Sequence, residues 1–396
     1  MLGIIPLWLL VLPLPQQKNL YRYSTYKAFM IKSRIEDVAF HVVGDAYVDF
    51  FCFLDDGGWP ENGGDSRLEE PVTTYAGGSA TNTATHLRAL QRNVTDCSPR
   101  VYLHTVLNHK DQYGKLLLTH AFDHGFSIIN CSKKSEALST GHCIVIVSGG
   151  ERSFMTHQGC VGQFRAEDLN VQDVVNTATD VHFHIAGFYN IPGFWNHQLE
   201  HKLKELRRAT TNLTISLVTQ HDATKEWDGG FDSLLPFLDF AIMNDLEARH
   251  IVRRGQGNNF NTNEQAVKDE IENWASYFGS VSPKTCIIVT RGEQGAVAFK
   301  GKEIVAQQST VPVKPVDPTG AGDAFTAGFI HGIWAWRASS NRSTEEDDAE
   351  PWPIAAIIQG LRMGCAVGRA AVLIRGASVP PQPEQIEKFQ NSLPTH

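Results

Sequence analysis

The chain contains no run of basic residues, no closely spaced pair of cysteines and no G-x-x-x-x-G-K-[ST] phosphate loop. Its 35 Lys and Arg are outnumbered by 43 Asp and Glu, and the net charge of −8 argues against a nucleic-acid partner and favours a small-molecule substrate. The seven cysteines are scattered and odd in number, which suits reduced thiols in the cytosol better than disulfides or a zinc site. The missing phosphate loop excludes a P-loop nucleotidase.

The start of the chain is unlike the rest. Residues 1–36 are expected to form an N-terminal extension or a leader, and residues 37–390 the main domain. Residues 1–15 are apolar but too short to span a bilayer comfortably. They also lack the basic start and the small-residue cleavage site of a signal peptide. We therefore expect a cytoplasmic protein with no membrane partner.

The remaining sequence alternates between short apolar runs and longer amphipathic segments. Strands are expected at 38–43, 101–107 and 181–187, and helices at 79–90 and 197–208, among others. This alternation predicts an α/β domain of three layers, α/β/α, with a mostly parallel central sheet.

A smaller β-structure is expected beside this domain. Two apolar runs at 141–147 and 153–157 are joined by a glycine turn, which is typical of a β-hairpin. Together with a short strand after the first buried one, they predict a small β-lid from about 49–56 and 140–158.

The most informative stretch lies around Asp323. Gly320 and Gly322 precede this carboxylate at the start of a long apolar run. If a helix starts here, the amides of Ala321, Gly322 and Asp323 are its unpaired first-turn donors and can hold an anion. An anion site and a base within a few residues suit phosphoryl transfer. An Asp-capped turn ahead of a buried helix gives the same pattern.

Two motifs resemble the signatures of the ribokinase, or PfkB-type, carbohydrate kinase family. The C-terminal signature is matched by Val316-Asp317-Pro318-Thr319-Gly320-Ala321-Gly322-Asp323, and the N-terminal one by Ala76-Gly77-Gly78-Ser79-Ala80-Thr81-Asn82. The resemblance covers roughly residues 38–385. It implies a ribokinase-like three-layer sandwich with a β-lid, the use of ATP and Mg²⁺, and transfer of the γ-phosphoryl group of ATP to a hydroxyl of a small carbohydrate.

The resemblance also assigns roles to individual residues. Asp323 is the base, and the charge on the phosphoryl group is stabilised by the amides of Gly320, Ala321 and Gly322. Substrate contacts fall to Asp49, Gly77, Gly78, Asn82 and Arg152. Nucleotide contacts fall to Asn244, Thr290, Gly292, Gly295 and Thr319.

Two further carboxylates, Glu247 and Asp317, are expected near metal ions. Asn244 and Glu247 match the N-x-x-E pattern of the family, which helps to organise Mg²⁺ through water. An Asn cap with Glu in the first helical turn explains the same residues equally well. Asp317 and Thr319 match positions that bind a monovalent cation in some relatives, so activation by K⁺ is a further hypothesis.

The sequence leaves the acceptor open. The nearest alternative is a nucleoside kinase similar to adenosine kinase, which needs room and an aromatic side chain to stack on the base. A catalytically inactive binding protein is the alternative from another class, although no matched site residue is missing. Self-association into a homodimer through the β-lid is a further hypothesis.

Overall fold

The computed structural model describes residues 38–55, 58–91, 100–132, 137–148, 151–254, 264–340 and 352–394. The expected N-terminal extension, residues 1–36, lies outside the described residues, as does the tip of the lid hairpin at 149–150. Among the described residues, no helix combines the length and the apolar character needed to cross a membrane.

The core of the fold is a nine-stranded sheet in the order β13-β12-β11-β10-β9-β8-β1-β4-β5. All neighbouring pairs from β5 to β11 are parallel, and only the pairs β11–β12 and β12–β13 are antiparallel. The expectation of a mostly parallel central sheet is confirmed. The strands are β1 Val38–Gly44, β4 Val101–Thr105, β5 Ser127–Asn130, β8 Asp180–Ala186, β9 Leu213–Val218, β10 Phe240–Asn244, β11 Cys286–Thr290, β12 Ala296–Lys300 and β13 Glu303–Gln308.

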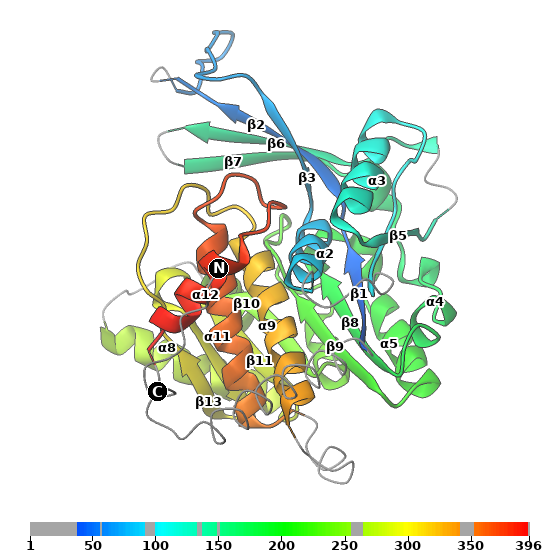
Figure 1. Ribbon diagram of the computed structural model, residues 1–396, viewed down its shortest axis with the longest axis vertical. Helices are drawn as coiled ribbons and strands as arrows, with labels where there is room; N and C mark the ends of the chain where they lie inside the picture. The colour runs from blue at the N-terminus through cyan, green and yellow to red at the C-terminus, as the bar shows by residue number, and fades with distance from the viewer. Residues whose placement is uncertain are drawn as a thin grey trace, which may run out of the picture.

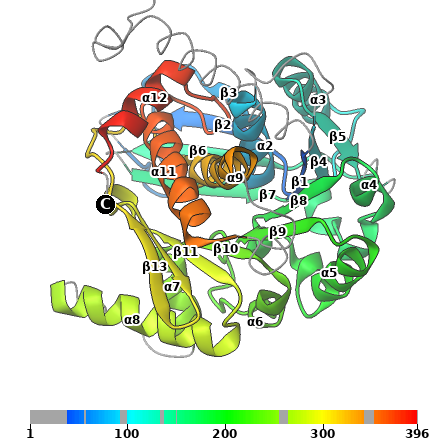
Figure 2. The same cartoon turned by 60° about the horizontal axis from the view of Figure 1, so that its bottom comes forward.

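Helices cover both faces of this sheet (Figure 2). One face packs on α2 Ser79–Leu90, α3 Gln112–His124, α9 Ala321–Ser339, α11 Ile354–Ala371 and α12 Pro383–Ser392. The other face packs on α4 Gln172–Val175, α5 Gln198–Ala209, α6 Phe231–Leu234, α7 Asp245–Val252 and α8 Glu264–Val281. The two faces bury separate apolar clusters, which is the three-layer arrangement that the sequence predicts.

The β-lid is larger than the sequence indicates. It is a four-stranded sheet in the order β3-β2-β6-β7, and Figure 1 shows it above the ends of α2, α9 and α11. Its strands are β2 Tyr47–Phe53, β3 Thr73–Gly77, β6 His142–Ser148 and β7 Glu151–His157. Strand β3 was not expected, because it is short, follows a proline and buries only its last two residues.

The helices α9 and α11 lie side by side, and at four glycines their backbones approach too closely to leave room for a side chain. An added Cβ at Gly328, Gly332, Gly360 or Gly364 would lie 2.7 to 2.9 Å from an atom of the other helix. Helix α11 starts at Ile354, and Ala356 and Ile357 belong to its buried stripe. Residues 341–351, between α9 and α11, lie outside the described residues.

The carboxyl ends of four parallel strands bring the predicted site together. Asp45 follows β1, Gln220 follows β9, Asn244 ends β10 and Thr290 ends β11. Because parallel strands end at the same edge of a sheet, these residues face one another across the start of α9. The β-lid lies over this edge (Figure 1).

Histidines are unusually frequent in the core. The buried ones are His41, His86, His104, His182 and His184. Burial lowers the pKa of His86 from 6.5 to about 4, although a hydrogen bond to the carbonyl of Ala377 opposes the shift. Because His86 stays neutral when folded, the unfolded chain binds one more proton below pH 6.5, and stability falls as the pH drops towards 4.

Replacing His86 with Gln should make the protein less sensitive to acid. The Gln amide can still donate to Ala377, but it takes up no proton in the unfolded chain. Between pH 6.5 and 4, the free energy of unfolding of the wild type should fall by about 1.4 kcal/mol per pH unit more than that of His86→Gln. Urea titrations at pH 6.5, 5.5 and 4.5 measure both slopes, and parallel slopes would contradict the assignment.

Candidate active site

Asp323 lies in the first turn of α9 and is buried. Its Oδ1 accepts a hydrogen bond of 2.7 Å from Ser79 Oγ, and its Oδ2 accepts one of 2.8 Å from Asn82 Nδ2. Burial raises the pKa of Asp323 to about 7, while the donors from Asn82 and Ser79 pull it down. A carboxylate that ionises near neutral pH is well suited to act as a general base.

Gln220 is a second partner of Asp323, and sequence analysis missed it. Its Nε2 donates to Asp323 Oδ1 at 3.1 Å and lies 3.0 Å from Ser79 Oγ. Gln220 has a φ of 65°, in the left-handed region that non-glycine residues seldom adopt. Such backbone strain is found where function fixes a side chain. The only sequence signal was its place directly after a buried strand.

Two more buried carboxylates lie close to Asp323. Burial raises the pKa of Asp49 to about 7, and the charges of Asp45, Asp323 and Asp317 raise it further. Burial also raises the pKa of Asp45 to about 6. Asp45 is held by the Nδ2 of Asn190, at 2.8 Å, and by the backbone amide of Ala80. Sequence analysis singled out Asp49 and passed over Asp45.

The two glycines of the N-terminal motif lie so close to neighbouring residues that a side chain would not fit at either position. A Cβ on Gly77 would lie 2.1 Å from Asp49 Oδ2. Gly78 has a φ of 88°, and its Cβ would lie 2.6 Å from the carbonyl oxygen of Asp45. The structure therefore brings Gly77, Gly78 and Asp49 together beside Asp323, as the sequence predicts for a substrate site.

The start of α9 forms the anion-binding part of the site. Gly320 caps the helix with a φ of 74°, and a Cβ there would clash with Ala377. A Cβ on Gly322 would meet no protein atom within 4 Å, because Gly322 faces open space and lines two cavities. The amide of Ala321 donates to the carbonyl of Pro318 at 3.2 Å. The role predicted for the amides of Gly320, Ala321 and Gly322 in holding an anion stays a prediction, and the amide of Asp323 belongs to the same first turn.

Asn244 and Glu247 form a reciprocal cap on α7. Asn244 Oδ1 accepts from the amide of Glu247, and Glu247 Oε2 accepts from the amide of Asn244. Glu247 is buried, which raises its pKa, and it also accepts a hydrogen bond of 2.6 Å from Thr219. Both residues line the same cavity as Asp323. Asn244 and Glu247 thus form the helix cap and also line the cavity, so neither of the two interpretations of this pair excludes the other.

Asp317 is engaged by several donors at once. Its carboxylate accepts from the amides of Thr319 and Gly376, and Arg152 Nη2 lies 3.1 Å from Oδ1. Arg152 belongs to lid strand β7, so this ion pair joins the lid to the loop before α9.

Within the described part of the chain, no group of three or more His, Cys, Asp or Glu is arranged to hold a metal ion.

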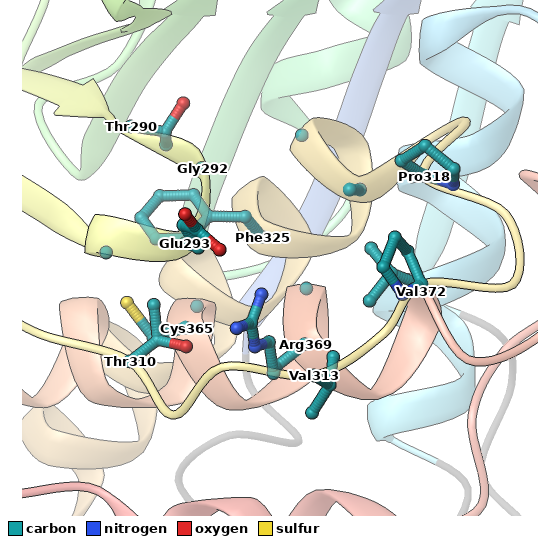
Figure 3. A pocket seen from close by; sticks show the side chains of 16 residues that line it. Thr290, Gly292, Glu293, Thr310, Val313, Pro318, Phe325, Cys365, Arg369 and Val372 are labelled. Carbon is teal, nitrogen blue, oxygen red and sulfur yellow. The ribbon is translucent and has the colours of Figure 1, made fainter. Parts of the chain in front are cut away.

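Two adjoining cavities meet at the start of α9. The smaller, of about 180 Å³, is lined by Asp323, Asn244, Glu247 and Gln220. The larger, of about 340 Å³, lies between the turn after β11 and helix α11 (Figure 3). Both cavities are lined by Thr290, Pro318, Ala321 and Gly322, so an elongated ligand can extend from one into the other.

The turn after β11, which holds Gly292 and Gly295, forms one wall of the larger cavity. Gly292 and Gly295 have φ of 54° and 93°, and a Cβ on Gly295 would lie 1.9 Å from the carbonyl oxygen of Gln308. Thr290 ends β11 opposite Asn244 of β10. The structure therefore places Thr290, Gly292 and Gly295 together.

Several buried polar atoms at the site have no hydrogen-bond partner among the described residues. They include Asn82 Oδ1, Arg152 Nε and Thr319 Oγ1. A buried polar atom without a partner costs stability, unless a ligand or water completes its bonds. The three atoms come from the predicted substrate and nucleotide residues.

The family model described as pfkB family carbohydrate kinase matches residues 41–384. The chain belongs to this family. Its site residues therefore lie within a pfkB domain that spans nearly the whole described chain.

Among curated proteins, this pfkB chain is similar to adenosine kinase 2 from Arabidopsis thaliana. The two are 27% identical over 227 residues, which cover 56% of this chain and 62% of that relative. The chain thus spans about three fifths of the length of this relative.

Solved ribokinases share the fold. Ribokinase from Giardia lamblia superposes with a TM-score of 0.69 at 18% identity, over 89% of this chain and 99% of that one. Ribokinase from Arabidopsis thaliana, complexed with ribose and ATP, superposes with a TM-score of 0.58 at 23% identity. The match covers 89% of this chain and 98% of that one. The ribokinase-like sandwich expected from the sequence is confirmed.

Replacing Gln220 with Gly separates its strain from its hydrogen bond. Gly accepts a positive φ, so we expect Gln220→Gly to unfold at the same temperature as the wild type or a higher one. Loss of a donor to the ionised carboxylate should raise the pKa of Asp323. Differential scanning calorimetry and a carboxyl ¹³C NMR titration, compared with Asp323→Asn, measure the two effects. A lower unfolding temperature together with an unchanged titration would contradict this role.

Proposed function

We propose that this pfkB protein transfers the γ-phosphoryl group of ATP to a hydroxyl of a small carbohydrate, with Asp323 as the base. One observation carries this proposal. A buried carboxylate that ionises near pH 7 lies in the first turn of α9, beside the first-turn amides of the helix and a cavity. The carboxylate of Asp323 and the helix amides are then close enough to act together, the carboxylate on the acceptor hydroxyl and the amides on the phosphoryl group.

The acceptor is held on the lid side of Asp323. Asn82 donates through Nδ2 to Asp323 and keeps its Oδ1 for a substrate hydroxyl. Asp49 and the bare backbone of Gly77 and Gly78 provide an acceptor and room for a sugar ring. Asp323 removes the proton of the hydroxyl as its oxygen attacks the γ-phosphorus, and the bond to the β-phosphate oxygen breaks.

The nucleotide lies on the other side of Asp323. The amides of Gly322 and Asp323 stabilise the negative charge on the transferred group, with Gly320 fixing the turn. Thr290, Gly292 and Gly295 line the larger cavity, and Thr319, whose buried Oγ1 has no partner among the described residues, lies in the turn before α9. Asn244 and Glu247 would hold Mg²⁺ through water, and the ion would neutralise charge on the triphosphate. Their side-chain oxygen atoms already accept hydrogen bonds within the protein, so contact through water fits this pair better than direct ligation.

The lid excludes water from the transfer. Arg152 of β7 pairs with Asp317, and Arg375 pairs with Glu70 of the segment between β2 and β3. The guanidinium of Arg375 also lies 4.5 Å from the ring centre of Phe53 on β2. Water that entered the site would compete with the sugar for the phosphoryl group. Arg152, with its unpartnered Nε, can contact the bound substrates as well.

We also propose activation by K⁺ near Asp317 and Thr319, and a homodimer formed through the lid. The unpartnered Thr319 Oγ1 supports the first. Ile144 and Met155, partly exposed on the lid face turned away from Asp49, support the second. Equal rates in K⁺ and Na⁺, or a monomer in sedimentation, would count against them.

The base is tested by Asp323→Asn. ADP release from MgATP is measured with ribose, fructose, 2-keto-3-deoxygluconate, adenosine and inosine. Turnover on one acceptor should fall by roughly 10²- to 10⁴-fold in the variant, which should still bind ATP. Because Asp323 must be ionised to take a proton, wild-type activity should rise as the pH increases through about 7. Full activity of the variant would contradict the mechanism.

A nucleoside acceptor is the second candidate, and Phe154 favours it. Register places Phe154 opposite Val145 and Val145 opposite Phe51, so Phe154 shares the lid face of Asp49 and Arg152. Its side chain is 57% exposed on that face and can stack on a nucleobase. The likeness to an adenosine kinase supports the same acceptor class.

Phe154→Ala distinguishes the two acceptors. If a nucleoside is bound, the KM for adenosine should rise roughly tenfold, while the KM for ribose stays unchanged, because only the base loses its stacking partner. Phe122→Ala, an 85% exposed aromatic on α3, serves as the matched control. Equal effects on both acceptors would rule out base stacking.

A further inference from the structure

The larger cavity holds two opposite charges in otherwise apolar surroundings. Its apolar walls include Val313, Phe325 and Val372. Arg369 enters it from α11, and Glu293 lies on the turn after β11 (Figure 3). Neither charge belongs to the predicted site residues, and the proposed phosphoryl transfer does not use them.

The guanidinium of Arg369 has a buried donor group that no described residue accepts from. Its Nε donates to the carbonyl oxygen of Val311, which fixes the plane of the guanidinium. Its Nη2 is buried and has no hydrogen-bond partner within the described ranges. Burial lowers the pKa of Arg369, and the charge of Glu293 opposes this shift. A buried guanidinium nitrogen without a partner is costly, so a ligand atom that accepts its hydrogen would stabilise the protein.

Glu293 and Arg369 form no direct ion pair, although the charge of one acts on the other. Glu293 is exposed and its carboxylate is directed towards the same cavity (Figure 3). Because both groups line one cavity and the charge of Glu293 acts on Arg369, the cavity presents a strong donor close to a strong acceptor. A planar ligand that carries an acceptor next to a donor fits this space.

We propose that Arg369 and Glu293 recognise the nucleobase of the phosphoryl donor, with Arg369 donating to a ring nitrogen of adenine and Glu293 accepting from its 6-amino group. Adenine presents a ring nitrogen acceptor beside this amine on either edge. The inference rests on the proposed function, because it takes ATP as the donor. It adds a specificity-determining pair to that site.

The position of the pair favours the base over the phosphates. The phosphates belong at the start of α9, where Gly322 and Asp323 offer their amides. Arg369 and Glu293 line the larger cavity alone, beyond the residues that the two cavities share. Apolar walls suit the faces of a planar base and not a phosphate.

The pair is tested by binding alone, so that the result does not depend on the acceptor or on catalysis. Calorimetry measures the affinity of the wild type for MgATP and for purine riboside triphosphate, which lacks the 6-amino group. The wild type should prefer ATP by about tenfold, as expected for a hydrogen bond to a charged group. Glu293→Ala should lose this preference, and Gln294→Ala, an exposed neighbour on the same turn, should keep it.

Arg369→Met supplies the second arm. It should weaken ATP binding by about tenfold and leave the binding of inorganic tripolyphosphate unchanged. Equal loss for both ligands would assign Arg369 to the phosphates and overturn the proposal. A wild type that binds both purine nucleotides equally, or that prefers GTP, would overturn it as well. An intact preference for ATP in a protein that phosphorylates no acceptor would leave this inference standing and refute the proposed function.

Discussion

The burial of one carboxylate at the N-terminus of a helix governs the rest of this structure. Asp323 is taken out of water, which raises its pKa, and it is then partly stabilised by hydrogen bonds from Ser79, Asn82 and Gln220. The positive end of the α9 dipole favours its ionised form as well. These opposing effects leave a carboxyl group that can exchange a proton near neutral pH. The glycines around it keep the space next to it open.

Each side of the site is fixed by a different part of the fold. The proposed acceptor side depends on the lid, which is joined to the core through Arg152 and Asp317 and through Arg375 and Glu70. The proposed nucleotide side depends on the carboxyl ends of β10 and β11 and on the close packing of α9 against α11. A ligand that touches both sides bridges the lid and the core. Asn82 Oδ1, Arg152 Nε and Thr319 Oγ1, which lack partners among the described residues, are available to such a ligand.

Much of the fold could be predicted from the sequence, because apolar periodicity and glycine-bearing turns are local signals. The expected helix at 79–90 is α2 to the residue, and the motif residues Asp49, Gly77, Asn82 and Asp323 lie together. Gln220, Asp45 and Arg369 could not be found in this way. Their roles arise from distant contacts: Gln220 reaches a carboxylate 103 residues away, and Asp45 is bound by an amide 145 residues away. Strand β3 was missed because its own pattern is weak: it is short and buries only its last two residues.

A crystal structure with a non-hydrolysable ATP analogue and an acceptor tests the central claim most directly. We expect the attacking hydroxyl to lie about 2.6–3.2 Å from the carboxylate of Asp323. We also expect the γ-phosphate to lie against the amide of Gly322 and the base to enter the cavity of Arg369 and Glu293. An acceptor hydroxyl bound away from Asp323, or phosphates bound away from the start of α9, would contradict the proposed mechanism.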